Sequence, residues 1–341
     1  MTHEFKSIIQ TAVKWQNEGL KMVLATVVAL EGSSYRRPGV RMLLAENGKW
    51  VGAVSGGCVE KEVYRQAQHV FENGKARLMS YDGTYRLGCE GTLYVLLEPF
   101  TVQDEFLTSF EKALSSRQNF SIKSFYEPGT DNQESSKNQG SIISIGSEDF
   151  TFQPESKTSD FDASASFEQE FGPLFQLCIF GAEHDAVALA KLADNLGWEV
   201  HIFASPDEHK TIDFFEGASS LKTPTFDAIN PSDFGENTAV ILMTHSFNKD
   251  VQYLLALKDS KPDYLGLLGP AHRREKLLGK FLEFHPEAEI EFLERLHGPA
   301  GIDIGAESAY EIGVSIIGEI LSVTRNRNPQ PLKNKSGRIH A

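Results

Sequence analysis

The chain has few cysteines and no apolar run long enough to cross a membrane. Its three cysteines, Cys58, Cys89 and Cys178, form no CxxC pair and are too few for a disulfide framework, which indicates a reduced, cytoplasmic protein. The longest clean apolar stretch, residues 22–30, falls far short of the roughly 18 to 20 residues that a transmembrane helix needs. The first ten residues also lack the pattern of a secretory signal. We therefore expect no membrane partner.

Basic residues are also scarce. Lys and Arg number 33 against 47 Asp and Glu, which gives a formal net charge of −14. Binding to nucleic acid depends mainly on attraction between phosphates and Lys or Arg, so this balance disfavours nucleic acid as a partner. The sequence contains no HExxH motif and no histidine cluster at metal-ligand spacing, so we expect no metal site built by the protein.

At roughly 150 residues per domain, the 341 residues predict about two domains. Residues 1–150 combine helical stripes with β-rich runs and an Asn-Gly hairpin signal, which predicts an α+β domain. In residues 174–325 strands alternate with helices, which predicts an α/β domain with a Rossmann-like, doubly wound parallel sheet. Residues 151–173 are rich in Ser, Asp and Glu and are expected to form a polar linker, and residues 326–341 a basic, disordered tail.

The first candidate site lies in "EGSSYRRPGVRM". Ser33 and Ser34 offer hydroxyl groups and backbone amides in a flexible turn. Arg36, Arg37 and Arg41 gather cationic donors within an otherwise acidic chain. The pattern predicts a site for an anion. The alternative is a surface turn whose arginines are only solvated.

The second candidate site is "GAVSGGCVE". Ser55 precedes Gly56 and Gly57, and the two glycines allow a ligand to approach the backbone closely. Cys58 then opens a predicted helix, where unpaired amides and the helix dipole lower the pKa of a thiol. Cys58 is therefore a candidate thiolate, with a packed, inert thiol as the alternative. Glu60, one turn later, could cap the helix or oppose thiolate formation.

The other two cysteines lie in different contexts. Cys89, in "LGCEG", lies between glycines as Cys58 lies beside them, and it comes just before a predicted strand. We therefore take Cys89 as a second candidate cofactor-binding thiol. Cys178 lies inside the apolar run "FQLCIF" and is expected to be a core residue.

In the second domain "GAEHDA" occupies the turn where dinucleotide-binding folds carry GxGxxG or GxGxxA. Gly181 and Ala186 fit the first and third positions, and His184 lies between them as a candidate ligand contact. The second position is Glu183, whose carboxylate would repel a pyrophosphate and whose Cβ obstructs close approach. Ala204 stands where an acid for the ribose is expected. These departures disfavour NAD(P) binding.

Two later loops follow predicted strands, at the edge where open α/β sheets place their ligands. "MTHSFNKD" supplies Thr244 and His245, and "GLLGPAHRREK" supplies Arg273. We take these three as candidate ligand-binding residues, with capping or structural roles as the alternative.

Seven strings in order resemble the successive motifs of the XdhC/CoxI family, whose members mature xanthine dehydrogenase and other molybdenum hydroxylases. They are "GSSYRRPGVRM", "GAVSGGCVE", "LGCEG", "FGAEHDAVALA", "MTHSFNKD", "YLGLLGPAHRREK" and "GIDIGAESAYEIGVSIIGEI". The resemblance implies a two-domain, non-catalytic chaperone that transiently binds molybdenum cofactor (molybdopterin). It implies that the candidate residues above bind this cofactor. It further implies sulfuration of the cofactor with a cysteine desulfurase and delivery to an apo molybdenum hydroxylase such as xanthine dehydrogenase, with a homodimer by analogy.

The sequence departs from the family pattern at several positions. Glu183 and Ala186 replace glycines, Ala204 replaces an acid, Glu90 interrupts a glycine pair and Pro270 replaces a small polar residue. The "SGGCVE" string is intact, which favours retention of cofactor handling by the first domain. Two alternatives stay open: a nicotinamide-dependent oxidoreductase built on the second domain, and a cofactor-free interaction scaffold for a dehydrogenase.

Overall fold

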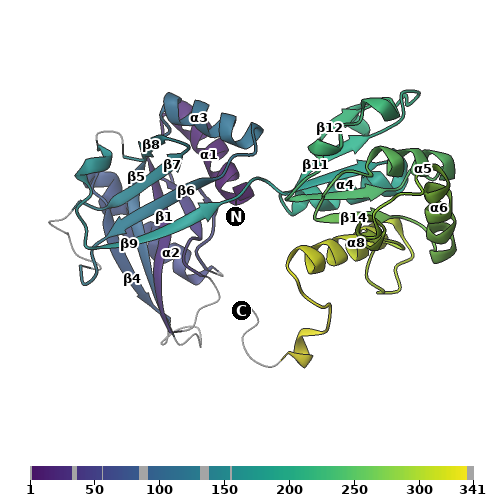
Figure 1. The fold of residues 1–341 in the computed structure, drawn as a ribbon. Coiled ribbons are helices and arrows are strands. Elements are labelled where there is room, and N and C mark those ends of the chain that lie inside the picture. Colours follow the sequence, from purple (N-terminus) through teal and green to yellow (C-terminus); the bar gives the residue numbers. More distant parts are fainter. Residues whose placement is uncertain are drawn as a thin grey trace. The chain divides into compact units, whose positions relative to one another are not determined.

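The computed structural model describes residues 2–32, 37–55, 57–83, 91–130, 138–153 and 156–335, except for the side chain of Cys58. The chain divides into two units, Met1–Pro173 and Leu174–Ala341 (Figure 1). Within the described residues no helix is both long enough and apolar enough to cross a bilayer.

The first unit is built on a five-stranded antiparallel sheet with the order β3-β2-β1-β5-β4. The predicted Asn-Gly turn joins β2 to β3 as a hairpin. Its strands are β1 (Met22–Gly32), β2 (Arg41–Ala45), β3 (Trp50–Gly52), β4 (Arg77–Asp82) and β5 (Gly91–Phe100).

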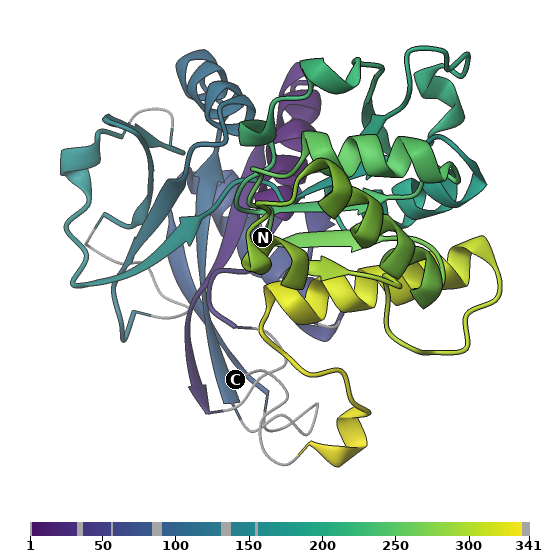
Figure 2. The same ribbon diagram turned by 45° about the vertical axis from the view of Figure 1, so that its right-hand side comes forward.

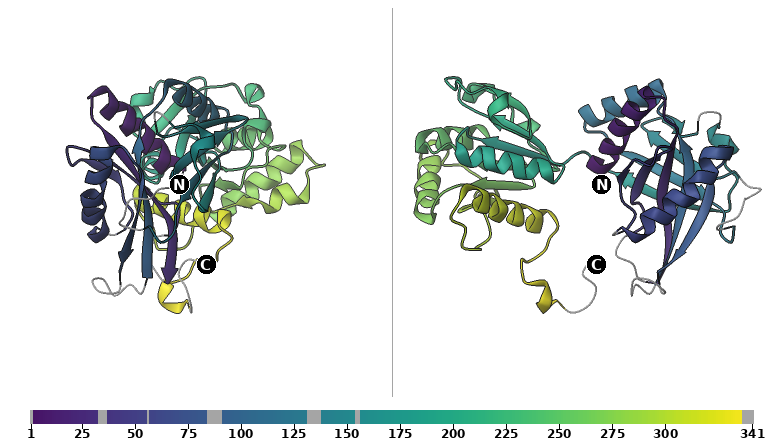
Figure 3. Two further views of the ribbon diagram at one scale, coloured as in Figure 1. Left: turned by 90° about the vertical axis from the view of Figure 1, so that its left-hand side faces the viewer. Right: turned by 180° about the vertical axis from the view of Figure 1, so that it is seen from behind.

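This sheet is covered on both faces, which explains the unbroken apolar runs in its central strands. Helix α2 (Cys58–Asn73) packs Val59, Val63 and Ala67 against one face, and lies across the sheet in the right panel of Figure 3. Helices α1 (Thr2–Asn17) and α3 (Asp104–Ser115) contribute to the apolar cluster on the other face.

A second, four-stranded antiparallel sheet completes the first unit, in the order β8-β7-β6-β9. Phe120 of β6 stacks on Phe171 of β9 with 4.7 Å between the ring centroids, and both belong to the cluster that contains α1. The strands are β6 (Phe120–Tyr126), β7 (Gly140–Ile145), β8 (Glu148–Thr151) and β9 (Ala165–Phe171).

Strand β9 corrects the prediction of a linker over residues 151–173. Residues 166, 168 and 170 are exposed polar positions, whereas Phe167, Gln169 and Phe171 point inward and pair along β6. The inward positions alternate with polar residues in a Ser- and Glu-rich segment, so composition alone hides the strand. The first unit therefore extends to Pro173, and the second begins at Leu174.

The second unit is a six-stranded parallel sheet with the order β12-β11-β10-β13-β14-β15. Counted from the first strand of the unit this is 3-2-1-4-5-6, the order of a Rossmann fold, so the predicted fold class is confirmed. The strands are β10 (Gln176–Phe180), β11 (Glu199–Phe203), β12 (Ala218–Lys222), β13 (Thr238–Leu242), β14 (Tyr264–Leu267) and β15 (Leu296–His297).

Helices cover both faces of this sheet, as Figure 2 shows. Helices α4 (His184–Asn195) and α8 (Ala309–Thr324) pack on the face of Leu177 and Ile179, and α5 (Phe247–Ala256) and α6 (Ala271–Phe284) on the face of Cys178 and Phe180. Shorter elements are α7 (Ile290–Glu294) and the 3-10 turns η1 (Thr158–Asp160), η2 (Ile212–Phe214), η3 (Phe226–Ala228), η4 (Pro231–Asp233) and η5 (Leu332–Asn334). Of the expected tail, residues 336–341 lie outside the described residues.

Candidate functional site

The turn before α2 is held by a single carboxylate. Helix α2 begins at Cys58, as the sequence predicts. Glu60 Oε1 accepts a hydrogen bond of 2.7 Å from the Ser55 amide, and Oε2 accepts one of 2.8 Å from the Ser55 hydroxyl. The Ser55 oxygen in turn accepts hydrogen bonds from the amides of Gly57 and Val59. The turn is therefore fixed by hydrogen bonds on both sides of the glycines.

The same contacts set the charge of Glu60. Burial raises the pKa of Glu60, but the hydrogen bonds from the Ser55 side chain and from nearby backbone amides outweigh it, so the pKa lies below its usual value. The carboxylate is ionised at neutral pH and its charge is shared by its donors. Glu60 therefore holds Ser55 as a charged carboxylate, and both roles that the sequence offers for it, capping and opposing a thiolate at Cys58, stay open.

Gly57 leaves space in front of this turn. Its φ of 120° lies in a region that side chains rarely adopt, and a Cβ placed there would meet no atom of the described residues within 4 Å. The glycine is thus required by the backbone and not by crowding. A ligand can approach the backbone here.

The predicted arginine cluster is divided by the structure. Ser33, Ser34, Arg36, Gly56 and Cys89 lie outside the described residues, and Arg37 is exposed. Arg41 is only 7% exposed, which corrects the prediction that it faces an anion at the surface. It begins β2, a strand covered on both faces, so its side chain enters the interior between the two sheets.

Arg41 instead braces the chain before it. Its Nη1 donates to the carbonyl oxygen of Gly39 at 2.9 Å and to Gln169 of β9. Its guanidinium carbon lies 5.8 Å and 5.3 Å from the ring centroids of Phe5 and Phe171. Burial lowers the pKa of Arg41 to about 10. Arg41 therefore ties the end of the predicted anion loop to the second sheet.

Glu98 is the acidic counterpart of Arg41 and was missed by the sequence analysis. It is fully buried on β5 and accepts hydrogen bonds from the amide and hydroxyl of Ser141, at 2.8 Å and 2.5 Å. Burial raises its pKa to about 7, although the Ser141 bonds and the charge of Arg41 oppose the shift. The available signal was a single Glu inside the apolar strand sequence "LYVLLEPF".

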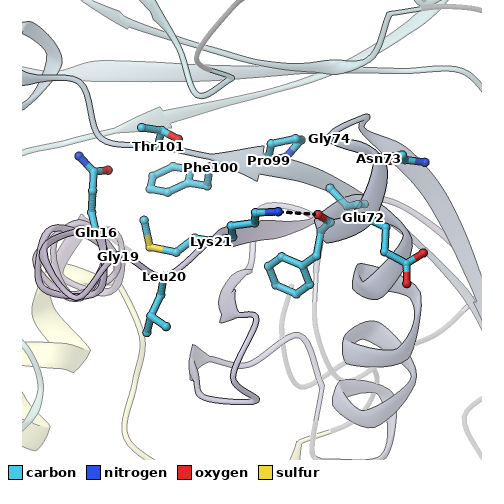
Figure 4. A pocket seen from close by; sticks show the side chains of 13 residues that line it. Gln16, Gly19, Leu20, Lys21, Glu72, Asn73, Gly74, Pro99, Phe100 and Thr101 are labelled. Carbon is cyan, nitrogen blue, oxygen red and sulfur yellow. Dashed lines mark hydrogen bonds between the residues drawn. The ribbon is translucent and has the colours of Figure 1, made fainter.

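A cavity of about 470 Å³ lies at the other end of α2 (Figure 4). Lys21, Phe71 and Phe100 are among its lining residues, and Lys21 Nζ donates to the Phe71 carbonyl at 3.5 Å. A 16-residue helix spans roughly 24 Å, so Cys58 and this cavity are at opposite ends of α2. The cavity does not belong to the Ser55–Cys58 turn.

In the second unit Gly181 makes the turn between β10 and α4 possible. Its φ is 144°, and a Cβ would lie 2.4 Å from the carbonyl oxygen of Met243. Glu183 is exposed at the N-cap of α4, 3.6 Å from Lys210 Nζ. His184 is exposed in the first turn of the same helix.

The expected ribose end of the Rossmann sheet is occupied by the protein's own side chains. Lys249 Nζ donates to Ser205 Oγ at 2.7 Å and lies 3.4 Å from Asp207 Oδ1. Together with Gly181, Glu183 and other residues, these side chains leave a cavity of only about 40 Å³. Ligand pockets usually enclose roughly 300 to 1,000 Å³, so no space for a dinucleotide is preformed here.

The structure brings Thr244, His245 and Arg273 together at the ends of β13 and β14. Thr244 Oγ1 donates to Asp250 Oδ1 at 2.6 Å, and Arg273 Nη2 to Asp250 Oδ2 at 2.7 Å. His245 Nε2 lies 3.0 Å from Asp185 Oδ2. Asp185 was not predicted from the sequence, because the loop after β13 that carries His245 and the first turn of α4 that carries Asp185 meet only in the folded unit.

The XdhC/CoxI resemblance implies an α+β unit that carries the Ser-Gly-Gly-Cys sequence, followed by a Rossmann unit. The structure has this architecture, and the dinucleotide turn of its Rossmann unit departs from the usual glycine pattern. Two family models match the chain: "XdhC and CoxI family" over residues 15–82 and "XdhC Rossmann domain" over residues 177–320. The chain belongs to the XdhC/CoxI family.

Relatives match along nearly the whole chain. A probable xanthine dehydrogenase subunit from Bacillus subtilis is 28% identical, over 95% of this chain and 98% of the relative. The molybdenum cofactor insertion chaperone PaoD from Escherichia coli is 27% identical, over 95% of this chain and 90% of the relative. The crystal structure of a xanthine dehydrogenase from Bacillus halodurans has 25% identity and a TM-score of 0.74, over 96% and 98% of the two chains.

Proposed function

We propose that this protein is an insertion factor that binds molybdenum cofactor and delivers it to an apo molybdenum hydroxylase of the xanthine dehydrogenase type. The observation that carries the proposal is the Ser55–Cys58 turn, which is fixed by Glu60 and open in front of Gly57. It lies within the match to the XdhC and CoxI family model. The relative PaoD, a molybdenum cofactor insertion chaperone, covers both units.

The chemistry of the turn suits this cargo. Molybdopterin is an anionic phosphate ester with a dithiolene-bound metal, so a receiving site needs anion donors and a ligand or contact for the metal. The turn offers backbone amides, and Cys58 at the start of a 16-residue helix is placed where a thiolate is favoured. We expect Ser33, Ser34, Arg36, Arg37, Gly56 and Cys89 to complete the cofactor site.

The role of Arg41 in this proposal is to position the site rather than to touch the cofactor. It holds the Gly39 carbonyl and Gln169, so it fixes the chain immediately after the arginine loop. The exposed Arg37 then remains the described cationic candidate for the phosphate.

The remaining steps of the proposed function are sulfuration of the bound cofactor and its transfer to the apo hydroxylase. We expect a cysteine desulfurase to take part in sulfuration of the cofactor while this chain holds it, and the apo hydroxylase to receive the sulfurated cofactor. Reaction chemistry belongs mainly to the cofactor and the desulfurase, while this chain binds and protects the cofactor as a non-catalytic chaperone. We expect these encounters in the cytoplasm and a homodimeric state.

A transfer assay tests the proposal. Cofactor-loaded protein is mixed with an apo molybdenum hydroxylase, and the activity of the hydroxylase is followed with time. Cys58→Ala is expected to reduce activation strongly, whereas Cys178→Ala, which alters a buried core thiol of β10, is the matched control and is expected to activate normally. Equal activation by both variants would contradict the role of Cys58.

A further inference from the structure

The carboxyl-terminal edge of the parallel sheet in the second unit has two neighbouring places for a ligand, of which one is filled by side chains and the other is a cavity. At the ends of β10 and β11, where a Rossmann fold holds a dinucleotide, Lys249 is bonded to Ser205 and Glu183 is paired with Lys210. The space left there is about 40 Å³. At the ends of β13 and β14 a separate cavity encloses about 200 Å³.

The open cavity combines an apolar floor with two basic side chains. This combination is typical of small-molecule sites, in which a few polar groups orient the ligand. The cavity is smaller than the roughly 300 to 1,000 Å³ of drug-sized ligand pockets, which restricts the ligand to a small molecule. Its lining residues are Met243, His245, Leu268, Gly269, Pro270 and Arg273.

Arg273 is oriented by a buried partner. Asp250 is only 1% exposed, and its Oδ2 accepts from Arg273 Nη2 at 2.7 Å. This uses one of the five guanidinium donors, and no other hydrogen bond of the Arg273 guanidinium is found among the described residues. The guanidinium is thus fixed in place with donors left for a planar or tetrahedral anion.

His245 is fixed from the opposite side. Its φ is 56°, a left-handed conformation that non-glycine residues adopt rarely, and its Nε2 lies 3.0 Å from Asp185 Oδ2. The contact with Asp185 leaves Nδ1 without a partner among the described residues. The guanidinium therefore offers oriented donors to the cavity, and the Nδ1 of the same imidazole, whose Nε2 faces Asp185, offers an acceptor.

We infer that this cavity binds a small phosphate monoester through Arg273 and His245, and that the second unit has exchanged the dinucleotide position for this neighbouring one. The oxygens of a phosphate monoester can accept from the guanidinium, and in its monoprotonated form the phosphate hydroxyl can donate to His245 Nδ1. Pro270 begins the first turn of α6, a 14-residue helix whose leading amides add to the favourable field. The site goes beyond cofactor binding by the first unit and can be tested without any cofactor.

Two kinds of phosphate monoester can supply the phosphate group. One is a phosphate ester without a nucleobase, such as the phosphorylated side chain of a pterin, and the other is a nucleotide. Calorimetric titrations of the full chain, purified without cofactor, with glycerol phosphate, AMP and NAD distinguish them. We expect saturable binding of glycerol phosphate, and AMP no tighter, because the cavity leaves no room for the base. Tighter binding of NAD than of glycerol phosphate would overturn the inference.

Three single variants locate the site. Arg273→Lys keeps a charge beside Asp250 but loses the planar fork, and His245→Asn removes the imidazole while tolerating a positive φ. Each is expected to weaken glycerol phosphate binding at least tenfold at unchanged thermal stability. Lys249→Gln, in the closed crevice, is the control and should bind as the native protein does.

Equal affinity in the native protein and in both site variants would overturn the inference, and so would a larger loss for Lys249→Gln. Neither result bears on the first unit, because the readout uses no molybdenum. Loss of cofactor in Cys58→Ala would likewise leave phosphate binding unchanged, so the two proposals fail separately.

Discussion

At the scale of single residues, Glu60 is the group on which the cofactor turn depends. Its pKa is lowered, so its contribution to stability is fully present above the ordinary carboxyl pKa and is lost as the pH falls through the folded-state value. We expect Glu60→Gln to cost about 1.5 to 3 kcal/mol at pH 7, the range for hydrogen bonds to a charged group. Thermal unfolding followed from pH 3 to 8 checks this.

The difference between native protein and Glu60→Gln should begin to shrink as the pH falls below the ordinary carboxyl pKa of about 4, and should disappear once the native carboxyl is protonated at its lower folded-state pKa. Glu72→Gln, at an exposed position near the end of the same helix, is the control and should change little at any pH. A difference that stays constant from pH 3 to 8 would show that the charge of Glu60 is not what holds the turn.

We expect the contribution of Glu98 to stability to depend on pH in the opposite direction to that of Glu60. Because burial raises its pKa to about 7, its contribution is fully present below the ordinary carboxyl pKa and is lost as the pH rises through about 7. Urea unfolding should therefore show the native first unit losing stability as the pH rises from about 4.5 to about 7, with no further loss from this group above that pH. Glu98→Gln, which cannot ionise, should reduce this slope, and an equal slope in both proteins would contradict the assignment.

Sequence reasoning located some of these residues and misplaced others for a physical reason. The glycines before Cys58 identify a helix start from local chemistry alone, and α2 begins there. Arg41 looks like its neighbours Arg36 and Arg37 in the sequence, but the strand that it starts is covered by a second sheet contributed by residues beyond 120. Local pattern carries no information about that cover.

At the scale of elements, the turn from β10 to α4 depends on Gly181. Its φ is 144°, and a Cβ at this position would lie only 2.4 Å from the carbonyl oxygen of Met243, so there is no room for a side chain. We expect Gly181→Ala to lower the free energy of unfolding of the second unit by at least about 1 to 3 kcal/mol, the cost of such backbone strain. Gly279→Ala is the control, since its Cβ would meet no atom within 4 Å.

Chemical denaturation checks this prediction. Gly279 lies inside α6, where alanine is the better helix former, so Gly279→Ala should be neutral or stabilising. If Gly181→Ala unfolds at the same denaturant concentration as the native protein, the turn does not depend on the backbone freedom of this glycine.

The elements with strong local periodicity are those that the sequence predicts well. Helix α2 begins at Cys58, where the sequence predicts a helix start, and the apolar run that contains Cys178 forms the buried strand β10. Strand β9 was missed because its inward residues are separated by Ser and Glu in a polar segment. Its pairing partner β6 lies about 45 residues earlier, so the pairing is determined by tertiary contacts and not by local propensity.

At the scale of the whole molecule, the second unit has the fold of a dinucleotide-binding domain without the open crevice that a dinucleotide needs. The strand order is that of a Rossmann fold, yet Glu183 and Lys249 occupy the positions around the expected dinucleotide. We expect no micromolar binding of NAD or NADP by the native chain. Glu183→Gly should improve the affinity measurably, and adding Lys249→Ala should improve it further, because the two changes free different parts of one crevice.

Calorimetry with NAD measures both steps. Micromolar affinity in the native protein would contradict this prediction and would favour the oxidoreductase alternative. No improvement in the double variant, with its fold intact, would show that other residues close the crevice.

The central claim is that the first unit holds molybdenum cofactor. The most direct measurement is the molybdenum and pterin content of the native protein and of Cys58→Ala, both purified from a host supplied with molybdate. If the first unit holds the cofactor, we expect molybdenum and pterin in equal amounts on the native protein. We expect a large loss of both from Cys58→Ala at unchanged thermal stability. Native protein that carries neither molybdenum nor pterin, or Cys58→Ala with native content of both, would contradict it.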